Sequence, residues 1–156
     1  RFAKAIGDKL KQQHLQLVTA ESCTGGQLAQ TITSVSGASE WFERGFVTYS
    51  NLSKQQTLGV DKALLNQYGP VSEKTALAMA KGALKQSPAS ISIAITGIAG
   101  PGGGSQETPV GTIWTAWASK KSFCQALCQH YSGDRLIIRY AAVEFALKTL
   151  LSLMEK

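Results

Sequence analysis

A serine in a short polar turn is the first residue whose type and setting suggest chemistry. The stretch 17–20 is apolar or β-branched, the stretch 21–26 is small and polar and ends in two glycines, and apolar residues recur at helical spacing from Gln27 to Ile32. This order predicts a buried strand, a tight turn and a helix. Such a turn aims backbone N–H groups and a helix dipole at one point, so Ser22 would lie beside stabilisers of a developing negative charge. Serine and threonine are also the usual helix N-caps, so a purely structural turn is the alternative.

The group that would activate Ser22 is Lys54. The two histidines, His14 and His130, lie in no catalytic motif, and no G-x-S-x-G sequence is present. A lysine can serve as the base for a serine nucleophile, provided that it is neutral. Because Ser53 is the predicted N-cap of a helix, Lys54 would lie in its first turn, where the helix dipole and partial burial both lower a lysine pKa. A solvated surface lysine is the alternative.

Two further hydroxyls, those of Tyr49 and Thr96, fall at the ends of predicted strands. Tyr49 closes the stretch 45–50, which is rich in strand formers, and its hydroxyl could relay a proton or orient the lysine. Thr96 closes the apolar stretch 91–96 and could hydrogen-bond a substrate or the serine–lysine pair. Both also fit a structural role, as strand residues with a hydroxyl at the rim.

The stretch 97–105 holds five glycines, too many for a plain connection. Glycines allow positive φ and close approach of the backbone to a ligand, and the absence of G-K-[ST] excludes a Walker loop. We expect either a backbone nest for an anion or a mobile lid. Arg135 and Arg139, four residues apart on one face of a predicted helix, could supply cations for a phosphate or carboxylate. A solvated helix face, with Arg135 paired to Asp134, is the alternative.

Composition narrows the range of partners. The chain has 156 residues and a formal net charge of +6, but its lysines are spread along the sequence without interleaved aromatics. Nucleic-acid binders usually concentrate their charge, so we expect no nucleic-acid partner, and an anionic small substrate fits the same sign of charge. The longest uncharged stretch, 86–106, is broken by proline and glycines, which argues against a membrane span.

The three cysteines form no C-x-x-C pair, and no signal peptide is visible. An odd number of cysteines argues against a disulfide framework and for the cytoplasm. Cys124, Cys128 and His130 would share one face of a strand, but their spacing fits no usual zinc pattern. We therefore expect no metal and interpret these cysteines as small buried hydrophobes.

The order of predicted elements gives one α/β domain over residues 1–156, with helices on both faces of a mixed sheet. The predicted strands cover 14–20, 45–50, 91–96, 110–118 and 123–131, and the last two form a hairpin. The predicted helices cover 2–13, 27–35, 54–58, 62–68, a segment after Ser72, and 135–153. Ligands of such sheets bind beyond the carboxyl ends of the strands, where we expect the loops 21–26, 50–54 and 96–105 to converge.

Taken together, these motifs resemble the CinA C-terminal domain family, whose best-understood members are nicotinamide-nucleotide (NMN) amidases. The resemblance covers essentially the whole chain and implies a three-layer α/β/α sandwich. The segments that carry it are 19–26, 45–51 with Lys54, 95–103, 109–112, and 132–135 with Arg139.

The resemblance implies hydrolysis of the NMN carboxamide to nicotinate mononucleotide and ammonia, in pyridine-nucleotide (NAD) recycling. It implies Ser22 as nucleophile, Lys54 as general base, and Tyr49 and Thr96 as catalytic residues that assist them. It implies no cofactor, and we expect a homo-oligomer. We expect the Gly25–Gly26 helix start to hold the oxyanion, and the substrate to meet Glu21, Thr24, Gly25, Gly26, Gly97, Gly102, Gly103, Arg135 and Arg139.

Two other hypotheses stay open from the sequence. The chain could be a nucleotide-binding module of this family that has lost amidase activity. Alternatively, the thiol of Cys23 could be the nucleophile in place of Ser22, because a helix N-terminus stabilises a thiolate. Release of ammonia from NMN separates an enzyme from a binder, and substitution of Ser22 or of Cys23 separates the two nucleophiles.

Overall fold

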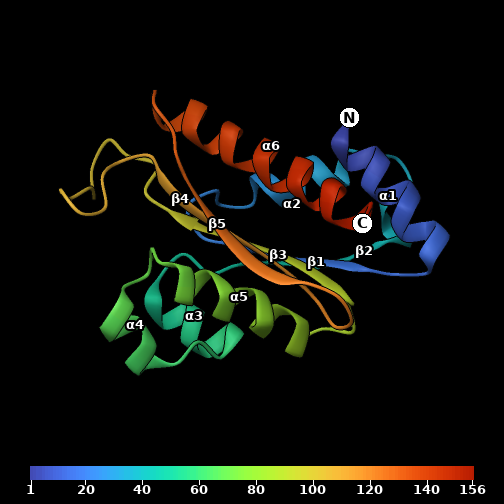
Figure 1. Cartoon of the computed structure of the whole chain (residues 1–156), viewed down its shortest axis with the longest axis horizontal. Coiled ribbons are helices and arrows are strands. Elements are labelled where there is room, and N and C mark those ends of the chain that lie inside the picture. Colours follow the sequence, from blue (N-terminus) through green and yellow to red (C-terminus); the bar gives the residue numbers. More distant parts are fainter.

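Five strands form one mixed sheet that lies between two layers of helices (Figure 1). The computed structural model describes all residues from Arg1 to Lys156. The strand order is β2-β1-β3-β4-β5; β1 runs parallel to β2 and β3, and β4 and β5 are antiparallel additions. The strands are β1 (Leu17–Glu21), β2 (Phe42–Val47), β3 (Ile91–Gly97), β4 (Thr112–Ser119) and β5 (Cys124–His130). The expected α/β fold with a C-terminal hairpin is confirmed.

The helices divide between the two faces of the sheet, as Figure 1 shows. Helices α1, α2 and α6 cover one face, and α3, α4 and α5 cover the other. Their bounds are α1 (Phe2–Gln13), α2 (Gln27–Thr33), α3 (Asn51–Leu58), α4 (Lys62–Tyr68), α5 (Glu73–Lys85) and α6 (Arg135–Met154), and a 3-10 turn covers Ala38–Glu40.

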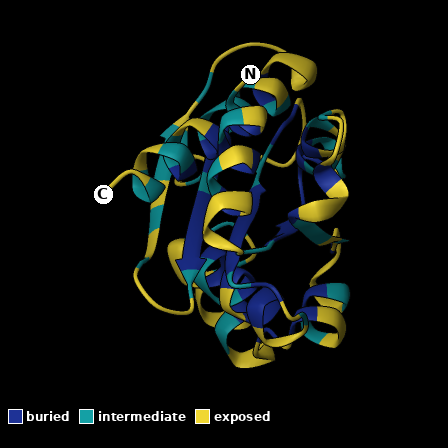
Figure 2. Ribbon diagram, turned by 90° about the vertical axis from the view of Figure 1, so that its right-hand side faces the viewer, coloured by how far each residue is buried: buried dark blue, intermediate teal, exposed yellow.

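The central strands are buried throughout, which explains why their sequences do not alternate between apolar and polar residues. Every residue of β1 is buried, as are six of the seven in β3, because helices cover both faces (Figure 2). One apolar cluster lies under α1, α2 and α6 and includes Trp117, whose indole N–H donates to the Ala146 carbonyl over 3.0 Å. The second cluster lies under α5. Burial is therefore deepest along the strands that lead to the site.

The carboxyl ends of the three parallel strands meet at one edge of the sheet. The Ser22 N–H donates to the Ile95 carbonyl over 3.0 Å, and the Thr48 N–H donates to the Glu21 carbonyl over 2.8 Å. These bonds hold the segment that follows β1 against β3, and the segment that follows β2 against the end of β1. The expected convergence of the three polar loops is observed.

Some predicted boundaries and environments are wrong. β1 starts at Leu17 rather than His14, because His14 ends α1 in the left-handed conformation, with φ at 56°. α3 starts three residues before Lys54, capped by Ser50, so Ser53 is the third helical residue of a capping box and not the N-cap. Cys124 is exposed and Cys128 half-buried, because β5 is an edge strand and not a covered one.

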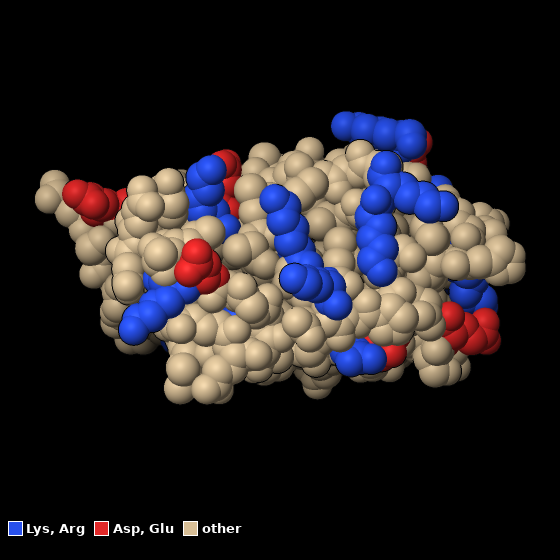
Figure 3. All heavy atoms as spheres, turned by 90° about the horizontal axis from the view of Figure 1, so that it is seen from below, with Lys and Arg blue, Asp and Glu red and all other residues tan.

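The basic side chains lie in small separate groups on the face that carries α3, α4 and α5 (Figure 3). Acidic side chains lie beside several of these groups, and no continuous basic band runs across this face. No helix combines the length and the apolar character needed to cross a bilayer. No three His, Cys, Asp or Glu side chains are grouped closely enough to hold a metal ion.

Replacing Gly82 with alanine should destabilise the fold, although alanine favours a helix. An added Cβ in α5 would lie 2.0 Å from the carbonyl oxygen of Leu58, the last residue of α3. Overpacking costs about 1–3 kcal/mol, which outweighs a helix-propensity gain of about 1 kcal/mol. Urea unfolding followed by circular dichroism measures the change. Gly102→Ala, whose added Cβ meets no atom within 4 Å, is the control. A Gly82→Ala variant at least as stable as the wild type would contradict this close packing of α3 and α5.

Candidate active site

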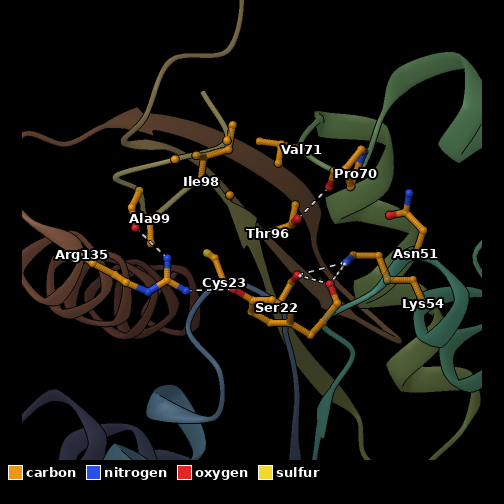
Figure 4. A pocket seen from close by; sticks show the side chains of 15 residues that line it. Ser22, Cys23, Asn51, Lys54, Pro70, Val71, Thr96, Ile98, Ala99 and Arg135 are labelled. Atoms are coloured by element: carbon orange, nitrogen blue, oxygen red, sulfur yellow. Dashed lines mark hydrogen bonds between the residues drawn. The ribbon is translucent and has the colours of Figure 1, made fainter. Parts of the chain in front are cut away.

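The side chains of Ser22 and Lys54 point toward each other in a cavity at the carboxyl edge of the sheet (Figure 4). The Lys54 Nζ lies 3.0 Å from the Ser22 Oγ, 3.1 Å from the Thr48 carbonyl oxygen and 3.3 Å from the Tyr49 carbonyl oxygen. The Ser22 hydroxyl has a longer contact of 3.5 Å with the Tyr49 carbonyl oxygen. A hydroxyl and an amine in direct contact form the minimal pair for nucleophilic catalysis.

The position of Lys54 follows from how α3 begins. Ser50 and Ser53 satisfy the first backbone groups of the helix through a reciprocal capping box. Lys54 lies one residue beyond the box, and α3 buries it together with Leu58 on one side of the helix. The capping residues thus set the point at which the lysine enters the cavity.

Lys54 is only 1% exposed, and no carboxylate contacts its amine. Burial lowers the pKa of Lys54, because the ammonium loses hydration that the carbonyl oxygens replace only in part; a negative charge on the nearby Cys23 would act in the opposite direction, as the smaller cause. The lowered pKa of Lys54 was expected, and burial, one of its two expected causes, is the main one that the structure shows. A larger neutral fraction of the amine makes this lysine fit for the role of a base.

The cavity has a volume of about 310 Å³ and is lined from all three converging loops. Eight of the residues predicted for the site line it: Ser22, Lys54, Tyr49, Thr96, Gly97, Gly102, Gly103 and Arg135. Seven further lining residues were not predicted for the site: Cys23, Asn51, Pro70, Val71, Ile98, Ala99 and Gly100. Of these, Cys23 was considered only as an alternative nucleophile. Pro70 lies two residues after the predicted helix 62–68, and no sequence signal indicated that it would form a cavity wall.

The hydroxyls of Tyr49 and Thr96 are bonded away from the serine–lysine pair. The Tyr49 side chain is largely exposed, and its hydroxyl accepts a 2.9 Å bond from Arg135. The Thr96 hydroxyl donates over 2.7 Å to the Pro70 carbonyl and so ties the end of β3 to the loop before α5. Tyr49 contacts Lys54 through its backbone carbonyl, which no side-chain argument could have predicted.

Arg135 closes the side of the cavity opposite Lys54, with Cys23 and Ser22 between them (Figure 4). Its Nη1 donates to the Gly100 carbonyl over 2.8 Å and its Nη2 to the Tyr49 hydroxyl. It forms no ion pair with Asp134, whose carboxylate instead caps α6 by accepting from the Ile137 N–H. Arg135 thus joins the glycine loop to the end of the β2 segment.

The glycine loop lines the cavity and keeps two backbone donors free. The N–H groups of Gly102 and Gly103 donate to no protein atom, and Gly103 has a φ of 91°, a conformation that glycine adopts without strain. Adjacent unpaired N–H groups of this kind can hold an anion.

Five predicted substrate-binding residues lie outside the cavity lining, and the packing of the Ser22 turn explains why. The carboxylate of Glu21 is fully buried and accepts hydrogen bonds from the start of α2, so it faces the helix and not the cavity. The Arg139 Nη2 donates to the Thr24 carbonyl over 2.7 Å, behind the turn. The five residues that were predicted to bind substrate but do not line the cavity are Glu21, Thr24, Gly25, Gly26 and Arg139.

Cys23 lines the cavity beside Ser22, but its thiol is poorly suited to be a nucleophile. Burial raises the pKa of Cys23 to about 12, so the reactive thiolate is scarce near neutral pH. The environment that favours a neutral amine at Lys54 therefore also favours a neutral thiol at Cys23.

Comparison with known proteins matches residues 1–154 to the model of the CinA C-terminal domain. The chain is 47% identical over 150 residues to the nicotinamide-nucleotide amidohydrolase PncC of Escherichia coli K12, covering 96% of this chain and 91% of that protein. It is 45% identical over 153 residues to the protein of that name from Pseudomonas putida, covering 97% and 94% of the two chains.

Solved structures agree with this match. The competence/damage inducible protein CihA from Agrobacterium tumefaciens superposes with a TM-score of 0.96 at 42% identity, over 99% of this chain and 94% of that one. A CinA superfamily protein from Escherichia coli superposes with a TM-score of 0.93 at 41% identity, over 97% of this chain and 88% of that one.

Alkylation should distinguish exposed Cys124 from buried Cys23. At neutral pH, iodoacetamide should modify Cys124, which is exposed, well before Cys23, which is buried with a pKa of about 12. Peptide mass spectrometry of the folded protein measures the order of modification, and urea-unfolded protein is the control in which both react. Rapid modification of Cys23 in the folded state would contradict its buried, protonated state.

Proposed function

The chain belongs to the CinA C-terminal domain family, and from this premise we propose that it hydrolyses nicotinamide mononucleotide to nicotinate mononucleotide and ammonia. Relatives that are 45–47% identical over nearly the whole chain are named for this amidohydrolase activity. The observation that carries the proposal is the 3.0 Å contact between Ser22 and a buried Lys54 inside a cavity. Such a pair can attack a carboxamide without a metal or cofactor.

Lys54 acts as the base in this proposal. A neutral amine has two N–H donors and one lone pair. The carbonyl oxygens of Thr48 and Tyr49 each accept one of the donors, so the lone pair is left to point at the Ser22 Oγ, the third partner of Nζ. The two carbonyls thereby orient the base. Lys54 takes the proton of Ser22 as its oxygen attacks the carboxamide carbon.

The oxyanion would be held by the N–H group of Cys23, which lines the cavity beside Ser22. It donates to no other residue, whereas the N–H of Ser22 is bonded to Ile95 and that of Gly26 to Glu21. This replaces the expectation that the Gly25–Gly26 helix start holds the oxyanion. One such donor contributes about 3–4 kcal/mol to transition-state stabilisation in characterised acyl-transfer enzymes.

The phosphate of the substrate would bind at the other end of the cavity. The free N–H groups of Gly102 and Gly103 and the guanidinium of Arg135 line that region. Planar guanidinium and backbone N–H groups both suit phosphate oxygens. This arrangement puts the carboxamide near Ser22 and the charged group away from the buried amine.

After the attack, Lys54 returns the proton to the departing nitrogen, which leaves as ammonia. Water then hydrolyses the ester on Ser22, with Lys54 again acting as the base. Residues 1–156 form, in our proposal, one domain that contains the whole site. The homo-oligomer and the cytoplasmic location remain predictions.

Ser22→Ala should abolish ammonia release and retain binding. We expect kcat to fall about 10⁴-fold or more, because the nucleophile is lost. The dissociation constant for NMN should stay within about tenfold, or ~1.4 kcal/mol, since the phosphate contacts lie elsewhere. An ammonia assay with calorimetric titration measures both, and Cys23→Ala, expected to keep most turnover, is the matched neighbour. Turnover that survives in Ser22→Ala but not in Cys23→Ala would assign the nucleophile to the thiol. Binding by the wild type without ammonia release would identify a binding module.

Lys54→Arg should be nearly inactive although it keeps the positive charge. Guanidinium does not deprotonate in proteins, and loss of a general base lowers the rate about 10²–10⁴-fold. In the wild type, kcat/KM should rise with pH as the amine loses its proton. Because burial lowers the pKa of Lys54, the midpoint should lie below the ordinary lysine value of about 10.4. A pH-rate profile measures this midpoint. Near-normal activity of Lys54→Arg would reduce Lys54 to an electrostatic role.

A further inference from the structure

We infer that Glu21 is a positioning residue for the proposed amidase reaction. Its carboxylate locks the turn that carries Ser22 by accepting hydrogen bonds from that turn and from the start of α2. This inference rests on the proposed function. It assigns to Glu21 an effect on kcat and not on substrate binding, in place of the substrate contact expected from the sequence.

The hydrogen bonds of Glu21 are the first support. Its Oε1 accepts from the Thr24 hydroxyl over 2.6 Å, from the Gly26 N–H over 3.2 Å and from the Leu28 N–H over 2.9 Å. Its Oε2 accepts from the Ala29 N–H over 3.0 Å. The residue is fully buried, so water does not satisfy these donors in its place. One side chain therefore joins the turn to the first residues of the helix.

The backbone of Glu21 is fixed as well. Its carbonyl accepts from the Thr48 N–H, and it pairs with Val47 of β2 and Ile95 of β3 in the sheet. Ser22 follows directly and is bonded to the same Ile95. The residue before the nucleophile thus connects β2, β3 and α2, and its side chain fixes how the chain turns after Ser22.

The carboxylate also determines which donors remain free. At α2 the internal carboxylate already takes the N–H groups of Gly26, Leu28 and Ala29. The N–H of Cys23, which follows Ser22 in the cavity, donates to no other residue, and Arg139 holds the Thr24 carbonyl on the same turn. Oxyanion stabilisation then depends on how firmly Glu21 holds this turn.

An ordinary helix cap would be a simpler role, and the chain contains such caps for comparison. Asp61 caps α4 by accepting one backbone N–H, from Ala63, and it is exposed. Glu21 instead lies six residues before the first residue of α2, is fully buried and accepts from four donors. Asp61→Ala is therefore a control that removes an acidic helix cap at a residue that does not line the cavity.

The test compares Glu21→Ala, Glu21→Gln and Asp61→Ala with the wild type in steady-state NMN hydrolysis and thermal unfolding. In Glu21→Ala we expect kcat to fall about 100-fold, the size of effect seen when one oxyanion donor is lost. KM should change less than about threefold, since the phosphate contacts are remote.

Glu21→Gln should lose about tenfold in kcat, because its amide nitrogen faces the Ala29 N–H as a second donor. Asp61→Ala should keep kcat. Sodium formate, a carboxylate small enough for the vacated space, should restore part of the kcat of Glu21→Ala only.

A fluorophosphonate that phosphonylates reactive serines gives a readout independent of NMN. Its reaction with Ser22 should slow in both Glu21 variants and not in Asp61→Ala. If the wild type reacts with the fluorophosphonate but does not hydrolyse NMN, the proposed substrate fails, and the slower labelling of the Glu21 variants still supports the positioning role. A folded Glu21→Gln with wild-type kcat and labelling rate would overturn the inference, as would a rise in KM at constant kcat. If Glu21→Ala fails to fold, the Glu21→Gln results decide.

Discussion

A lysine amine buried without a carboxylate partner is the constraint on which the rest of the site depends. Its charged form loses hydration, and only the oxygens of Ser22, Thr48 and Tyr49 replace that hydration. The fold holds Lys54 there by capping α3 with Ser50 and Ser53 and by packing the helix against α5. The environment that disfavours the ammonium is the one that suits the proposed base. Stability given up at this residue is consistent with a functional position.

The two potential anion sites at this edge of the sheet differ in one respect. The N-terminus of α2 is filled by the carboxylate of Glu21, while the glycine loop keeps the N–H groups of Gly102 and Gly103 free. Negative charge on a ligand is therefore favoured beside Arg135 and the loop, and disfavoured beside Glu21. This asymmetry sets the orientation in which we expect the substrate to lie, with the carboxamide toward Ser22.

The sequence predicted the architecture well because strong local signals agreed with one another. The continuous apolar stretch of β3 and the paired β4–β5 hairpin were identified with small boundary errors. The contact between the side chains of Ser22 and Lys54 was also predicted. What failed was side-chain direction. Glu21, Thr24 and Arg139 stand in the motifs that carry the family resemblance, yet they hydrogen-bond to one another and not to the cavity. The Thr24 hydroxyl donates to the Glu21 carboxylate, and Arg139 donates to the Thr24 carbonyl, because these groups are packed inside the protein. Pro70 and the Tyr49 carbonyl belong to the site through tertiary contacts that no local pattern encodes.

The most direct test of this account is a measurement of the protonation of Lys54 itself. In protein labelled with ¹³C at lysine Cε, the Lys54 resonance can be assigned by its absence in Lys54→Arg and followed as a function of pH. We expect Lys54 to titrate with a pKa below the ordinary lysine value of about 10.4, and the exposed lysines to titrate near that value in the same sample. A Lys54 pKa equal to or above that of the exposed lysines would contradict the central claim that burial prepares this amine to act as a base.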